Sequence, residues 1–250
     1  MEKHLKSIIN VLQYFTMYFI VALIVVGLLF NYPLYISRVV GWVLTILACT
    51  LWLKSKKDNL FIHCNFSIIH WKDIVYPFLV IGSVDFLIFY MHYNFNLLLN
   101  VSQTPEVIEL TQSNRFMTFL IFGLIVPIFE EIFYRGLIFN EFRDNFTTIT
   151  AILLQAIIFG ILHERAQMIY AFIAGILFAV LYLWLKTIWA PIIAHIINYN
   201  LFLYSSTLIK LNSYCYGLFY ILPMLAMLIV SIYLLWKNRD GIFYKHNKIN

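Results

Sequence analysis

The sequence predicts an all-α protein, a polytopic bundle of about eight transmembrane helices. Of its 250 residues, 62% are apolar and only 12% are charged, and the mean hydropathy is +0.84. Polar residues are too few to cover a water-soluble core of this size, so lipid must contact much of the surface. Cysteine usage gives no competing class, because the 3 cysteines are scattered and have no metal-site or disulfide spacing.

Runs without Asp, Glu, Lys or Arg locate the spans, since a helix needs about 20 apolar residues to cross the hydrocarbon. One of the runs is interrupted by Asp85, and several are short enough that we expect them to continue past their flanking charges. No linker, repeat or low-complexity tract divides the chain, so a single integral membrane domain over residues 1–250 is expected. The runs cover residues 7–37, 39–53, 74–91, 116–129, 146–162, 166–185, 187–209 and 211–236.

The basic residues predict the orientation of the spans. Of the 17 Lys and Arg residues, thirteen lie at the termini or in the even-numbered gaps, and only Arg38, Arg115, Arg165 and Lys210 lie on the other side. The positive-inside rule then places both termini in the cytoplasm of a multi-pass cell-membrane protein, and the abundance of Ile, Phe, Asn and Lys indicates a bacterial one. Topology thus explains the net charge of +5, so nucleic acid is not an expected partner.

Ionisable residues at membrane depth are the candidate functional residues, because a charge in hydrocarbon costs at least about 2.5 kcal/mol. Glu130 and Glu131 follow the fourth charge-free run, and Arg135 stands one turn after Glu131 on the same helix face. A Glu131–Arg135 salt bridge would leave Glu130 as a carboxylate for proton transfer. The alternative is that the charges merely mark the end of a span.

Two histidines lie in the following spans. His163 and His195 follow Glu130 at intervals of 33 and 32 residues, and Asn198 comes three residues after His195. Imidazole can stabilise an oxyanion, transfer a proton or bind a metal, and the Asn198 amide can donate a further hydrogen bond. The alternative for a single membrane histidine is a hydrogen bond between helices.

Two other polar residues fall within the spans. Asp85 has either a supporting role or, as the commoner case, a hydrogen bond to a Tyr or Ser of a neighbouring helix. Gln155 shares a four-residue spacing with Phe159 and His163, which places all three on one helix face. It is therefore a candidate lining residue of an intramembrane active-site cavity.

Over residues 116–200, these motifs resemble the CPBP intramembrane proteases, which include CAAX prenyl endopeptidases, abortive-infection proteins and bacteriocin-immunity proteins. The family motif E-E-x-x-x-R stands as Glu130, Glu131 and Arg135, and F-x-x-x-H runs from Phe159 to His163. The third motif is a His with Asn or Asp four residues later. His195 matches it, but residue 199 is Tyr.

The resemblance implies an intramembrane endopeptidase that hydrolyses a membrane-associated protein or a small peptide, such as a pheromone or bacteriocin precursor. Glu130, assisted by His163, would activate water, while Glu131 and Arg135 orient the site. His195 would stabilise the oxyanion together with Asn198 or the hydroxyl of Tyr199. No cofactor is required by the motifs. Zinc stays open as a divalent metal, and its ligands would be Glu130, His163 and His195.

Two other functions stay open at this point. A secondary transporter could use Glu130, His163 and His195 as a proton path, although no inverted repeat is detectable. A non-proteolytic membrane protein could bind a sensor or transporter partner, modulating a sensor kinase or giving bacteriocin immunity by binding. Membrane lipid surrounds the protein in each case.

The depth of the motifs in the membrane predicts one helix length. If the helix that carries Glu130 ended at Arg135, Glu130 would lie roughly 8 Å from its cytoplasmic end, against roughly 24 Å for His163. We therefore expect this helix to continue through Asn140 to Arg143. His195 would reach the same depth through a tilt of its helix or a break after Pro191.

Overall fold

A computed structural model describes residues 2–95, 105–165 and 167–210, with short pieces between 225 and 237. Every regular element in these residues is a helix, so the all-α prediction is confirmed. The chain divides into two compact units, one of Met1–Phe66 with Gln103–Gln155 and one of Ser67–Ser102 with Ala156–Asn250. The single domain over residues 1–250 stays a prediction.

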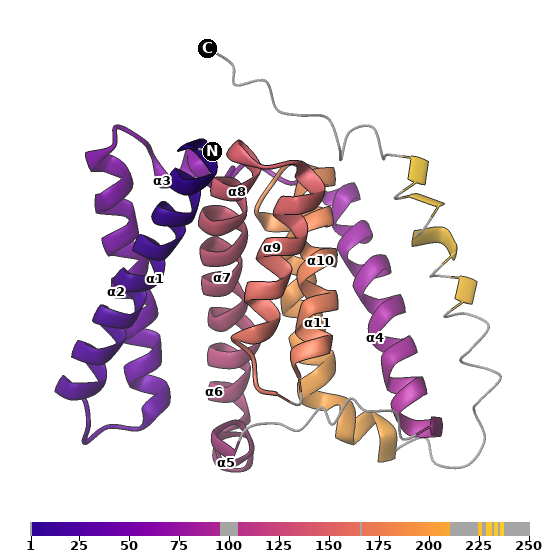
Figure 1. Ribbon diagram of the computed structural model, residues 1–250. Coiled ribbons are helices and arrows are strands. Elements are labelled where there is room, and N and C mark those ends of the chain that lie inside the picture. The colour runs from indigo at the N-terminus through magenta and orange to yellow at the C-terminus, as the bar shows by residue number, and fades with distance from the viewer. Residues whose placement is uncertain are drawn as a thin grey trace. The chain divides into compact units, whose positions relative to one another are not determined.

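The first unit begins with a hairpin of two apolar helices, α1 (Glu2–Leu28) and α2 (Leu34–Ser55), which lie side by side (Figure 1). Pro33 directly precedes α2 with φ −54°, where its missing N–H costs no helical hydrogen bond. The first expected span, 7–37, is therefore corrected. It ends at Leu28, and Arg38 lies inside α2.

A 31-residue apolar helix, Arg115–Asn145, follows in the same unit. Its start is fixed by Asn114, whose side chain accepts a hydrogen bond from the Met117 N–H at 3.0 Å. The expected continuation of this helix past Arg135 to Arg143 is confirmed. Its segments are α6 (Arg115–Leu120), the π-helical η2 (Ile121–Ile125), α7 (Val126–Glu131), the π-helical η3 (Ile132–Phe139) and α8 (Asn140–Asn145).

Two short helices accompany the long one. α5 (Pro105–Ser113) directly precedes it, in a stretch expected to be loop. α3 (Leu60–His63) follows α2, and Cys64 at its end packs against the long helix. A Cβ on Gly136 would lie only 2.5 Å from Cys64 Sγ, so the glycine allows this contact.

Aromatic rings hold the long helix against the hairpin. Phe129 stacks on Trp42 of α2 and on Phe133, with centroid distances of 5.5 and 5.6 Å. Tyr18 of α1 contacts Phe129 at 6.0 Å and Phe133 at 5.7 Å. Offset and tilted rings at these distances add to the burial of apolar surface. The residues on both sides of Glu130 and Glu131 are therefore anchored.

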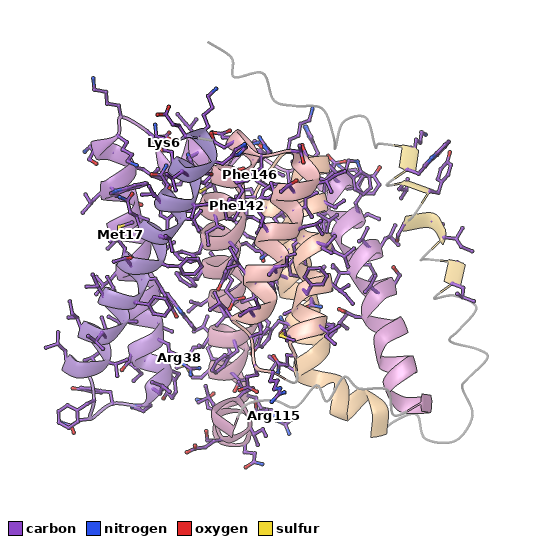
Figure 2. The ribbon with its side chains drawn as sticks, in the orientation of Figure 1. Lys6, Met17, Arg38, Arg115, Phe142 and Phe146 are labelled. Atoms are coloured by element: carbon purple, nitrogen blue, oxygen red, sulfur yellow. The ribbon has the colours of Figure 1, made fainter. Side chains whose placement is uncertain are left out.

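The two ends of the first unit carry different side chains. At one end, Asn10 donates a hydrogen bond to Glu141 Oε1 at 2.8 Å and accepts one from Lys56 at 3.1 Å. Figure 2 shows Lys6 and Phe146 at this end and Arg38 and Arg115 at the other.

The second unit contains η1 (Trp71–Ile74), α4 (Val75–Phe95), α10 (Met168–Leu185) and α11 (Trp189–Lys210), and α9 (Thr148–Ile161) enters it at Ala156. Small residues bring α9 close to α10, because a Cβ on Gly175 would lie 3.1 Å from the Cα of Ala156. The core of the unit is Val80, Ile81, Ala174, Phe178, Leu181 and Ala194.

A tight turn joins α10 to α11. Lys186 takes the left-handed conformation with φ 52°, and its carbonyl accepts a hydrogen bond from Ser67 Oγ at 2.8 Å. Thr187 Oγ1 donates to the Ser67 carbonyl at 2.6 Å. Pro191 lies in the first turn of α11, which continues to Lys210. The expected break after Pro191 is therefore absent.

The apolar helices make this a membrane protein. Four described helices are long and apolar enough to cross a membrane: α1, α2, Arg115–Asn145 and α10. Shorter apolar helices are Val75–Asp85 and α9. Large apolar side chains point outward, such as Leu23, 78% exposed, and Leu51, 68% exposed, as a lipid-facing surface requires. Apart from short pieces, the eighth expected span, 211–236, lies outside the described residues.

Candidate active site

The glutamate motif lies in the middle of the long helix of the first unit. Arg135 Nη1 donates a hydrogen bond to Glu131 Oε1 at 2.8 Å, and both side chains are 0% exposed. The predicted i,i+4 salt bridge is therefore present. A buried pair of this kind persists only when each charge compensates the other, because taking either one out of water is costly.

Glu130 lies beside this pair and is only partly buried. It interacts electrostatically with the guanidinium of Arg135, although Glu131 does so more strongly. The hydroxyls of Tyr18 and Tyr134 also lie within electrostatic range of Glu130. The arrangement thus sets one carboxylate apart from the ion pair, in polar company that includes two phenols.

The backbone changes its hydrogen-bond pattern at the same place. The π-helical segment η3 begins at Ile132, directly after Glu131, and includes Arg135. A π-helical turn is wider than an α-helical one, so it redirects the side chains that follow it, and such turns are frequent at functional sites. The sequence gives no sign of it, since η3 reads as an ordinary apolar stretch.

His163 lies just beyond the end of α9 in the second unit, and its orientation is set by Phe159. Its Nδ1 lies 2.7 Å from the Phe159 carbonyl oxygen. A carbonyl can only accept, so Nδ1 carries the proton, and in the neutral ring Nε2 is an acceptor. The two rings also pack with centroids 4.4 Å apart. His163 is thus held in the tautomer whose Nε2 can take a proton.

His195 lies on α11 and is only 4% exposed. Its ring stacks on Phe178 at 4.8 Å with an interplanar angle of 28°, and it meets the edge of Phe159 at 6.0 Å. Phe159 therefore contacts both histidines. The structure brings the second and third motifs together through the first residue of F-x-x-x-H.

Asn198 is held by two polar partners on other helices. Its Nδ2 donates to Asp85 Oδ1 at 2.8 Å and also to the Tyr170 hydroxyl. Tyr170 in turn donates to Asp85 Oδ1 at 2.8 Å. The expectation that Asp85 would hydrogen bond to a Tyr or Ser of a neighbouring helix is confirmed. Both N–H groups of the Asn198 amide are engaged in this arrangement.

Gln155 is fully buried on α9. Among the residues that the structure describes, neither its Oε1 nor its Nε2 has a hydrogen-bond partner. A buried amide in this situation is costly in an apolar protein. Its assignment as a cavity-lining residue stays a prediction.

The candidate residues fall in two groups. Glu130, Glu131 and Arg135 belong to the first unit, and His163, His195 and Asn198 to the second. Each group is assembled within its own unit. Within neither unit do the described residues include a group of three His, Cys, Asp or Glu side chains placed to hold a metal ion.

Two residues of the second group were missed by reasoning from sequence. Phe178 supports His195, and Tyr170 completes the contacts of Asn198. They lie eight residues apart on α10 and therefore share one helix face. That spacing was visible in the sequence, but an apolar helix offers many such pairs.

Comparison with known proteins covers the segment that contains all three motifs. Residues 112–202 match the family described as Rce1-like, type II CAAX prenyl endopeptidase. The predicted resemblance to the CPBP family is thereby confirmed. A Bacillus subtilis (strain 168) protein named "Putative membrane peptidase YdiL" is 30% identical over 118 residues. That stretch covers 47% of this chain and 46% of the relative, so the chain matches less than half of the relative's length. No solved structure matches.

Proposed function

We propose that the protein is an intramembrane endopeptidase that hydrolyses a peptide bond of a membrane-associated protein or small peptide. One observation carries the proposal. Inside the segment that matches the CAAX endopeptidase family, Glu130 stands beside the buried Glu131–Arg135 pair, which takes up the second carboxylate. A carboxylate kept out of an ion pair at membrane depth is suited to proton transfer.

In the proposed reaction, Glu130 takes a proton from water as the water oxygen attacks the peptide carbonyl carbon. Nε2 of His163 accepts a hydrogen bond from the same water and orients it. The carbonyl π bond opens and its oxygen becomes an oxyanion. When the carbonyl re-forms, the C–N bond breaks and the leaving nitrogen receives the proton that Glu130 holds. No step requires a redox partner.

His195 is the proposed donor to the oxyanion, together with Asn198 or the hydroxyl of Tyr199. A preorganised donor in a water-poor site contributes strongly to catalysis of acyl transfer. Glu131 and Arg135 orient Glu130, because the guanidinium interacts with both carboxylates. Lipid surrounds the helices, so we expect a substrate that is itself held in or at the membrane.

The substrate class follows from the family match. A prenylated C-terminal peptide is the substrate class that the family description names. We also propose small apolar peptides, such as pheromone or bacteriocin precursors. The test is cleavage of two quenched fluorescent peptides, one farnesylated at its CAAX cysteine and one unmodified, by the detergent-purified protein with and without a chelator. Cleavage that Glu130→Ala and His163→Ala abolish supports the proposal, whereas equal cleavage by all three proteins contradicts it.

The proposed orientation has both termini in the cytoplasm. Lys6 and Lys56 lie at the end of the first unit where Asn10 meets Glu141, while Arg38 and Arg115 lie at the opposite end (Figure 2). A reporter that fluoresces only in the cytoplasm, fused at either end, should be bright. A dark fusion at either end would contradict this orientation.

A second function is favoured by the contacts of Asn198. Both of its N–H groups are engaged by Asp85 and Tyr170, and Tyr199 stands at the position of the family amide. A site without its second oxyanion donor suits a protein that binds a membrane partner, such as a sensor kinase, without cleaving it. If the cellular function of the protein survives Glu130→Ala, this second function is supported.

A further inference from the structure

Three polar side chains from three helices meet inside the second unit: Asp85 of α4, Tyr170 of α10 and Asn198 of α11. Asp85 is 2% exposed and Asn198 is 5% exposed. Tyr170 and Asn198 both donate to Asp85 Oδ1 at 2.8 Å, and Asn198 also donates to Tyr170. Each side chain therefore bonds both others, which closes a ring of hydrogen bonds that we name the Asp85 cluster.

The Asp85 cluster constrains α11 in a way that apolar packing cannot. Hydrogen bonds depend on the angle at donor and acceptor, whereas apolar contact is not directional. The amide of Asn198 is planar, and with both N–H groups engaged its position is defined relative to α4 and α10. Because Asn198 lies three residues from His195 on the same helix, the cluster also sets the rotation of α11 at His195.

His195 has only aromatic rings among its printed side-chain contacts. It stacks on Phe178 at 4.8 Å and meets the edge of Phe159 at 6.0 Å. Stacked rings can slide past each other with little loss of contact, so these neighbours leave the in-plane direction of the imidazole weakly defined. An oxyanion donor must be held to well within 1 Å to be effective.

We propose that Asp85 and Tyr170 are positioning residues, which hold Asn198 and, through α11, fix the imidazole of His195. The catalytic meaning of this positioning rests on the proposed peptidase function, but the positioning itself does not. Asp85 acts here as a hydrogen-bond acceptor for two donors. A carboxylate that relayed protons would instead have to gain and lose a proton.

The test is the ring ¹⁵N spectrum of His195 in the full-length protein, labelled at histidine, purified in detergent and assigned with His195→Gln. Asp85→Leu removes the common acceptor and should shift the His195 signals. Asp85→Asn should leave them in place, because an amide oxygen accepts the same two hydrogen bonds. His63, in the first unit, serves as a reference signal that stays fixed.

A double variant tests the order of the contacts. Since Asp85 acts through Asn198, Asp85→Leu with Asn198→Ala should give the same His195 shift as Asn198→Ala alone. If Asp85→Leu does not fold, Tyr170→Phe removes only a hydroxyl and should also shift His195. In the peptide assay, these variants should lower kcat more than they raise KM.

Two results would overturn the inference. His195 signals that do not move in folded Asp85→Leu or Tyr170→Phe would show that the cluster does not position the ring. Signals that move as far in Asp85→Asn as in Asp85→Leu would show that the charge, and not the acceptor geometry, matters. The spectrum does not depend on peptide cleavage, so full activity of Glu130→Ala would refute the peptidase proposal without touching this one.

Discussion

The main-chain carbonyl of Phe159 accepts a hydrogen bond from Nδ1 of His163 at 2.7 Å, and the two rings pack at 4.4 Å. The same phenylalanine ring meets His195 at 6.0 Å. The spacing in F-x-x-x-H is therefore a structural requirement. Four residues at the end of a helix bring the carbonyl of the first residue to the imidazole of the last.

Phe159→Leu should lower peptidase activity by as much as about 100-fold, because the carbonyl stays but both imidazoles lose the ring that packs against them. The measurement is kcat/KM on the cleaved peptide, with thermal unfolding in detergent recorded for the same samples. Phe142→Leu is the matched control, since Phe142 is equally buried but packs against Phe146 in the first unit. Equal activity loss in both variants would mean that the effect is general destabilisation.

Arg135→Met should destabilise the protein by about 3–5 kcal/mol, because it leaves the carboxylate of Glu131 buried without its partner. Glu131→Leu together with Arg135→Met should recover most of that stability, since no uncompensated charge remains at this pair. Thermal unfolding in detergent measures both effects. The double variant should still be slow in peptide cleavage, because Glu130 loses the guanidinium that orients it. Full activity in the double variant would show that the pair has no role beyond stability.

Gly136→Ala should destabilise the first unit by about 1–3 kcal/mol, because the new Cβ would meet Cys64 Sγ at 2.5 Å. Cys64→Ala in the same chain should relieve part of this cost. Gly41→Ala provides the control, since a Cβ there meets nothing within 4 Å and the substitution should stabilise the helix by about 0.5–1 kcal/mol. A melting temperature unchanged by Gly136→Ala would contradict the close approach.

The length of the helix that carries Glu130 was predictable, because Glu130 and His163 could reach the same depth only if the helix passed Arg135. The break between α1 and α2 was placed wrongly. The charge at Arg38 is obvious in the sequence, but the chain turns at Asn31-Tyr32-Pro33, where proline ends one helix and starts the next. A charge near a span end tolerates burial in the interface, whereas proline geometry does not adapt.

The site was predictable only as separate residue types. A lone Asp85 in a span predicts a hydroxyl partner, but which hydroxyl depends on which helices are neighbours, and this is settled by packing. Tyr170 is therefore invisible from sequence. The π-helical segment η3 was equally hidden, because a shift of one residue in the backbone hydrogen bonds leaves no trace in composition.

The most direct test of the peptidase proposal is kcat/KM for Glu130→Gln, which keeps the size of the side chain and removes its ability to accept a proton. Glu109→Gln, on the exposed face of α5, is the matched control. We predict that Glu130→Gln lowers peptide cleavage by at least about 100-fold while Glu109→Gln leaves it unchanged, as loss of a general base requires. Cleavage by folded Glu130→Gln at the rate of the unmodified protein would contradict the mechanism.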